Sequence, residues 1–210
     1  MKTSHLRRGL CAIVAAGTLL VGAGLTPASA EPNNPDILET STKPMNVIGF
    51  DKKIAKQNGY DIRKDDRGVE YTIPEDTPQG SMEGARFMPG QEPSGEASSG
   101  VTPFNTTYGD CGTATLTGAG KSFSTAYAIT NTWLGFATSH TWRVPVASSQ
   151  GYQIYNLDGL APAFSYSWTA SRSISFRGWP YNSYVSNGQV VTALGFVCSS
   201  MSPSDSWYGE

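Results

Sequence analysis

The sequence predicts an all-β protein, in which an antiparallel β-sandwich or small barrel is closed by one disulfide and follows a short helix, a β-hairpin and a flexible linker. Two features of the C-terminal half predict this class. All five tryptophans fall within residues 101–210, where only four basic and four acidic side chains occur, so this part can form a core. Its apolar residues alternate with small polar ones in short runs between turns, which is the period of β-strands.

Residues 1–30 have the pattern of a secretory signal peptide. Basic residues open the segment, an apolar stretch follows, and Ala28-Ser29-Ala30 matches a cleavage motif. We therefore expect a secreted, extracellular protein whose mature chain begins at Glu31 and has no membrane span once the signal is cleaved. The pattern leaves the export route open.

The segment 31–73 is acidic and has few aromatic residues, so it can bury little surface by itself. Its apolar residues first recur at helical spacing, which predicts a helix over Asn46–Gln57. They then alternate in 60–64 and 69–73 around the turn sequence Asp65-Asp66-Arg67-Gly68, which predicts a β-hairpin. A helix and one hairpin are too small to be stable alone, so this segment either docks on the β-domain or stays loosely formed.

Residues 74–107 are rich in Pro, Gly, Ser and Glu and have no apolar period, so we expect a linker. Residues 108–210 form the expected β-domain. Among its strands, Gln189–Ser199 is apolar on both faces, which predicts one central strand after the hairpin turn Asn187-Gly188.

The mature chain holds two cysteines, Cys111 and Cys198, which lie 87 residues apart at the first and last expected strands of the β-domain. An even number of cysteines in an oxidising compartment predicts a disulfide. Closing a loop of that length stabilises a fold by about 4–5 kcal/mol in the chain-entropy model. The alternative is two free thiols, one of them a nucleophile.

Several short stretches of the sequence are similar to a known group of proteins. They are Cys111-Gly112-Thr113, Tyr166-Ser167-Trp168, Cys198-Ser199 with Pro203 and Asp205, and the upstream stretch from Gly49 to Arg63. On these motifs the chain resembles small secreted proteins of actinobacteria over most of its mature length. The resemblance implies export and a β-domain, and it implies no activity and no site residues.

Charge and composition exclude several kinds of function. The net charge of −2 argues against nucleic-acid binding, because such proteins carry a basic surface. His140 is the one histidine of the mature chain and its cysteines are expected to be bonded, so we expect no metal and no other cofactor. A hydrolase is the first alternative function: His140 would act as the base for a serine, oriented by Asp110 or Asp158. The sequence contains no nucleophile-elbow motif that would support it.

Aromatic residues between two expected strands favour ligand binding. Trp179, Tyr181 and Tyr184 surround a proline that disfavours a central strand, and flat aromatic faces can stack on sugar rings. Asn182 would supply hydrogen bonds beside them. The competing interpretation is that these rings close the end of the sandwich as part of its core.

These observations together predict a non-enzymatic binding or structural β-module that acts at the cell envelope or outside the cell. Its partner would be a cell-wall or extracellular glycan, or another protein. The second alternative is a protein-interaction factor, such as an inhibitor or a toxin, in which residues 31–100 form a leader that is removed on maturation.

Overall fold

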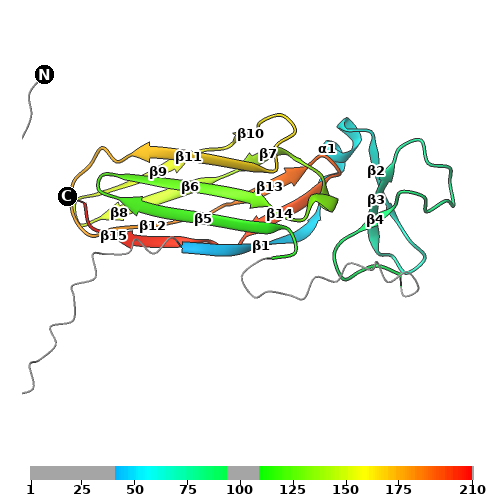
Figure 1. Ribbon diagram of the computed structural model, residues 1–210, viewed down its shortest axis with the longest axis horizontal. Coiled ribbons are helices and arrows are strands. Elements are labelled where there is room, and N and C mark those ends of the chain that lie inside the picture. Colours follow the sequence, from blue (N-terminus) through cyan, green and yellow to red (C-terminus); the bar gives the residue numbers. More distant parts are fainter. Residues whose placement is uncertain (1–40, 94–108, 210) are drawn as a thin grey trace, which may run out of the picture. The chain divides into compact units, whose positions relative to one another are not determined.

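The computed structural model describes residues 41–93 and 109–209, which belong to one compact unit and form three antiparallel sheets (Figure 1). In spatial order, the eight-stranded sheet consists of β10 (Gly159–Leu160), β7 (Ala137–Thr141), β13 (Gln189–Thr192), β14 (Phe196–Ser200), β1 (Ser41–Phe50), β5 (Gly112–Ala119), β6 (Ser122–Ile129) and β11 (Ser167–Ser173). The four-stranded sheet consists of β15 (Ser204–Trp207), β12 (Tyr181–Tyr184), β8 (Arg143–Ser148) and β9 (Gly151–Asn156). The three-stranded sheet consists of β2 (Tyr60–Lys64), β3 (Glu70–Pro74) and β4 (Arg86–Phe87).

The predicted all-β class is confirmed, and the helical content of the described part is small. It consists of α1 (Lys52–Gln57) and the short 3-10 helix η1 (Thr132–Leu134). No helix within residues 41–93 and 109–209 combines the length and the apolar character that a bilayer crossing requires. The expected signal peptide, 1–30, and residues 94–107 of the expected linker lie outside the described residues.

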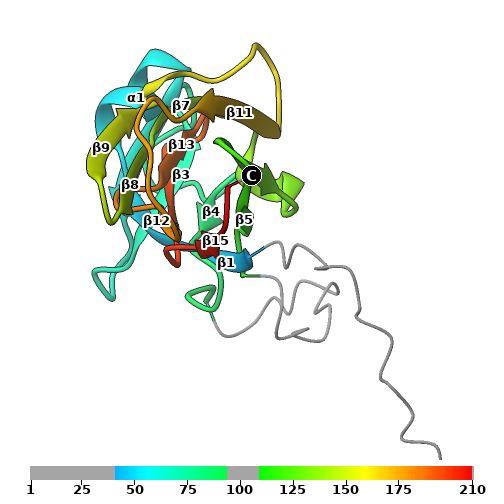
Figure 2. The ribbon, with the colours of Figure 1, turned by 90° about the vertical axis from the view of Figure 1, so that its left-hand side faces the viewer.

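The four-stranded sheet is the continuation of one half of the eight-stranded sheet. β7 leads directly into β8, β9 into β10, β12 into β13 and β14 into β15, and the strands keep the same order in both sheets. The two sheets curve around a shared interior, which Figure 2 shows along the strands. β15 lies against β5, because the Trp207 ring packs directly on Gly118, which has no side chain. The strands thus bend where the eight-stranded sheet continues into the four-stranded sheet. This bend gives the four-stranded sheet an inner face toward the core and an outer face away from it.

Side-chain alternation along the strands builds the core between these sheets. In β6, Phe123, Tyr127 and Ile129 are buried, while the serines and alanines between them stay partly exposed. Trp142, which separates β7 from β8, is fully buried and its indole N–H donates to Thr125 Oγ1 at 2.9 Å. Burying a large apolar side chain stabilises a fold by about 1.5–3 kcal/mol. The buried aromatic residues of the C-terminal half therefore form the stabilising core that the sequence predicted.

The expected helix over Asn46–Gln57 is wrong in its first half. Residues up to Phe50 form β1, which pairs with β14 on one side and with β5 on the other, and only Lys52–Gln57 is helical. Met45 points into the core and is fully buried, and the Phe50 ring lies 4.8 Å from that of Phe196. Pairing on both edges satisfies backbone groups that a helix would have satisfied locally, so the tertiary contacts override the helical spacing.

The predicted disulfide between Cys111 and Cys198 is present, and it lies beside β1. The Cys111 N–H donates to the Met45 carbonyl at 3.0 Å, and Cys198 is the registered partner of Val47. Both cysteines are fully buried. The disulfide therefore joins β14 to the start of β5, the two strands that flank β1. β1 itself precedes the 87-residue loop that the disulfide closes.

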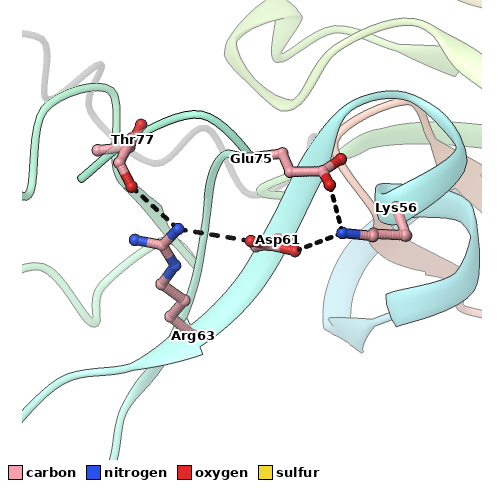
Figure 3. Close-up of polar contacts among 5 residues, drawn as sticks. All are labelled: Lys56, Asp61, Arg63, Glu75 and Thr77. Atoms are coloured by element: carbon pink, nitrogen blue, oxygen red, sulfur yellow. Dashed lines mark hydrogen bonds and ion pairs between the residues drawn. The ribbon is translucent and has the colours of Figure 1, made fainter. Parts of the chain in front are cut away.

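The helix and hairpin dock on the β-domain. The hairpin of β2 and β3 confirms the prediction, and β4 adds a third strand within the segment expected to be linker. The Asp51 N–H donates to the Gly195 carbonyl at 2.7 Å, and Ala55 of α1 packs against Gly195. Figure 3 shows how exposed ion pairs join α1 to the hairpin: the Lys56 ammonium lies 2.5 Å from Glu75 and 3.5 Å from Asp61.

The single central strand expected at Gln189–Ser199 is also corrected. The structure divides it into β13 and β14, which pair with each other around a turn at residues 193–195. Gly195 makes this turn possible because its φ of 87° lies in the left-handed region, which glycine adopts without a steric penalty.

Candidate binding groove

A hollow lies on the outer face of the four-stranded sheet, beside the start of β1. We call it the outer groove, and its volume is about 900 Å³. It is lined by Ser41, Thr42, Lys43, Pro145, Ala147, Tyr152, Asn182, Ser183, Tyr184, Ser204, Asp205 and Ser206. Its position follows from the bend between the sheets, because the inner face of the same strands is filled by buried core residues such as Val146 and Trp207.

Two tyrosines supply flat apolar surface in the outer groove. Tyr184 of β12 is 49% exposed and Tyr152 of β9 is 64% exposed. Cross-strand register places Ser206, Asn182, Ala147 and Tyr152 side by side in one row, and Tyr184 follows Asn182 by two residues on the same face. The tyrosines therefore flank a low floor formed by small side chains.

Hydrogen-bonding groups lie between the two rings. The Asn182 amide oxygen accepts a hydrogen bond from the Ser206 hydroxyl at 2.9 Å, which orients the amide across the floor. Its amide nitrogen donates one long hydrogen bond, at 3.5 Å, to the Pro180 carbonyl, so its second N–H group can donate to a ligand. A polar amide between flat apolar surfaces is suited to a ligand that presents both hydroxyls and apolar ring faces.

Little charge faces the outer groove. The Asp205 carboxylate accepts backbone hydrogen bonds from Gly118 and from Ser206, both at 2.7 Å, so its oxygens are already engaged in holding β15 against β5. The Lys43 side chain is exposed and forms no ion pair within residues 41–93 and 109–209. The groove thus has one cation at its edge and no carboxylate that is free of protein donors.

The three aromatic residues proposed from the sequence occupy different environments. Tyr184 lines the outer groove, whereas Trp179 is 53% exposed beyond the start of β12 and is not among the lining residues. Tyr181 is 0% exposed, and its hydroxyl donates to the Phe176 carbonyl at 3.0 Å. Because no face of its ring is open, Tyr181 is a core residue and cannot stack on a ligand. The structure adds Tyr152 of β9 to the residues that line the outer groove. The sequence around Tyr152 does not indicate which face of the strand is exposed.

His140 is buried, and its ring nitrogens face two other protein groups. Its Nε2 donates to the Leu157 carbonyl at 3.0 Å, while its Nδ1 lies 3.4 Å from the Tyr127 hydroxyl. The Trp168 ring covers it at a centroid distance of 4.3 Å. This burial lowers the pKa of the imidazole. The hydrogen bond to Leu157 and the negative charge of Asp158 raise the pKa, but by less than burial lowers it. Within the described residues, no serine hydroxyl is hydrogen-bonded to it.

The two aspartates considered as partners of His140 bind backbone groups instead. Asp158 accepts the N–H of Trp142 at 2.6 Å and lies 3.5 Å from Arg143. Asp110 accepts the N–H of Val47 at 2.7 Å, and partial burial raises the pKa of its carboxyl despite that hydrogen bond. Both carboxylates therefore have structural roles in fixing strand ends.

Within residues 41–93 and 109–209, no three His, Cys, Asp or Glu side chains are grouped in a way that could hold a metal ion.

Comparison of the chain with family models, with curated proteins and with solved structures found no match.

Proposed function

We propose that this chain is a secreted, non-enzymatic carbohydrate-binding module that acts at the cell envelope or outside the cell and holds a sugar chain in the outer groove. The observation that carries the proposal is the pair of exposed tyrosines, Tyr184 and Tyr152, on either side of the Asn182 amide. Sugar rings have apolar faces and polar edges, which this arrangement complements. The signal-peptide pattern and the disulfide support an extracellular location.

The two alternatives have less support. A hydrolase that uses His140 needs an accessible base beside a hydroxyl nucleophile, whereas this ring is buried between Leu157, Tyr127 and Trp168. An interaction factor that loses residues 31–100 as a leader would also lose β1, which lies between β14 and β5. Its loss would leave two open strand edges and an empty site where Met45 is buried.

The size of the expected effect follows from the exposure of Tyr184. A fully covered aromatic side chain buries about 200 Å², so a ring that is 49% exposed offers roughly 100 Å², of which a flat ligand covers about half. At about 25 cal/mol per Å², that contact contributes about 1.2 kcal/mol. Tyr184→Ala should therefore weaken binding about eightfold.

The test is retention of the mature chain by purified cell wall, chitin and cellulose, followed by titration with soluble fragments of the retained polymer. Tyr184→Ala should lower the affinity, while Tyr184→Phe, which keeps the ring, should stay within about twofold of the wild type. Trp179→Ala is the matched control for an exposed aromatic residue outside the groove, and its affinity should not change. Thermal melts of each variant confirm folding.

Two results would count against the proposal. Retention by none of the polymers would contradict carbohydrate binding itself. If Trp179→Ala lost binding while Tyr184→Ala and Tyr152→Ala bound as the wild type does, the outer groove would not be the binding site.

A further inference from the structure

The outer groove crosses the strands rather than running along them. The Ser204 N–H donates to the Ser41 hydroxyl at 3.1 Å, so the start of β1 lies beside β15, and β12, β8 and β9 follow in order. All five strands contribute lining residues. Because neighbouring strands lie about 4.8 Å apart, the floor of the groove is about 19 Å long.

The two tyrosines have a defined spacing along this floor. Tyr184 is on β12 and Tyr152 is on β9, with β8 between them. Tyr152 is paired with Ala147, which is paired with Asn182, two residues before Tyr184. Two strand spacings sideways and two residues lengthwise place the Cα atoms of the tyrosines about 12 Å apart.

This spacing fits an extended chain of sugars. Each ring of such a chain advances it by about the distance between two neighbouring strands, and in a β-1,4-linked chain every second ring presents the same face. The two tyrosines would then lie under alternate rings, and the ring between them would face Ala147 and the Asn182 amide.

Within residues 41–93 and 109–209, no lining residue lies beyond β1 at one end of the groove or beyond β9 at the other, so the described part of the chain leaves both ends open. At one end the lining residues are the exposed Thr42 and Lys43 at the start of β1. At the other end the groove reaches β9, which is the last strand of its sheet in the part of the chain that the structure describes. A site that recognises the terminal sugar of a chain needs a wall at one end, because most of that ring must be enclosed.

Given the proposed function, on which this inference rests, we infer that the ligand is an internal stretch of a linear, β-1,4-linked polysaccharide. About four rings lie across β1, β15, β12, β8 and β9, with Tyr184 and Tyr152 under alternate rings.

Calorimetric titration with chito-oligosaccharides and cello-oligosaccharides of one to six rings tests this inference on the mature chain. The affinity should rise about tenfold from two rings to four and then stay constant, because two rings cover one tyrosine, three are enough to cover both, and four span the groove. Chemical opening of the reducing-end ring of the six-ring probe should leave its affinity unchanged. In Tyr152→Ala the gain in affinity between two and four rings should disappear, while Trp179→Ala, which changes an exposed aromatic residue outside the groove, should keep the length dependence of the wild type.

The possible failures are distinguishable. Full affinity for one or two rings, or loss of binding on opening the reducing end, would overturn internal recognition and leave carbohydrate binding intact. Equal length dependence in Tyr152→Ala and in the wild type would overturn the assigned path across the strands. If neither the oligosaccharides nor the insoluble polymers bound, the proposed function itself would be wrong.

Discussion

Removal of the disulfide should destabilise this protein by a predictable amount. The bond between Cys111 and Cys198 closes a loop of 87 residues, and the chain-entropy model assigns such a loop about 15 cal/mol/K, or about 4.6 kcal/mol at 25 °C. With a urea m-value of about 2 kcal/mol/M, the unfolding midpoint should fall by about 2.3 M. The m-value should also rise, because the open denatured chain exposes more surface.

The assay is urea unfolding followed by tryptophan fluorescence, for the oxidised chain, for the chemically reduced chain and for the double variant Cys111→Ala with Cys198→Ala. The reduced chain keeps both buried sulfurs, so it isolates the loop term from the cavity that alanine leaves. The double variant should be less stable than the reduced chain by the cost of that cavity. If reduction lowered the free energy of unfolding by less than about 1 kcal/mol, the reasoning would be refuted. Such a result would mean that the unfolded chain is already constrained without the disulfide.

Three further predictions concern stability. The stability of the protein should fall as the pH drops below 6.5, because burial lowers the pKa of His140 and the unfolded chain then binds a proton that the folded chain does not bind. Melting temperatures between pH 7.5 and 5.5 should show this fall, and His140→Phe should abolish it. Burial raises the pKa of the Asp110 carboxyl. The stability that this carboxyl contributes is therefore present below pH 3.8 and is lost as the pH rises through its pKa in the folded protein. At pH 7, Asp110→Asn should therefore be at least as stable as the wild type, while Asp110→Ala should lose about 1–2 kcal/mol in urea unfolding because the Val47 N–H loses its acceptor; equal losses would contradict this account. Gly118→Ala should cost about 1–3 kcal/mol, because the added methyl would overlap the Trp207 ring, and an unchanged melting temperature would show that β15 does not press on β5 as described.

Local signals in the sequence were sufficient for the elements that depend on few residues. The hairpin of β2 and β3 was predicted within one residue, because Asp65–Gly68 marks its turn and the flanking residues alternate. The start of β1 could not be predicted in the same way. Val47 and Phe50 fit a helix as well as a strand, and only the presence of β14 and β5 on its two sides decides between them.

The candidate site was predicted in part. The cluster around Pro180 directed attention to Tyr184 and Asn182, which both line the outer groove. Tyr181 was assigned to the site although it is buried, because strand alternation does not say which of two neighbouring aromatic residues points outward. Tyr152 was missed because its place in the outer groove depends on Ala147 and Asn182, which lie in the same row only in the folded sheet.

The sequence by itself determined the all-β class and the pairing of the cysteines, because period-two alternation is a local property and residues 31–210 hold only two cysteines to join. The tertiary structure alone decided where the long strands bend, which face of the small sheet is open and which tyrosines share it. These features depend on contacts between residues far apart in the chain, such as Gly118 with Trp207 and Ser41 with Ser204. Such contacts form only when the whole sheet has closed around its core, so no short stretch of sequence contains them.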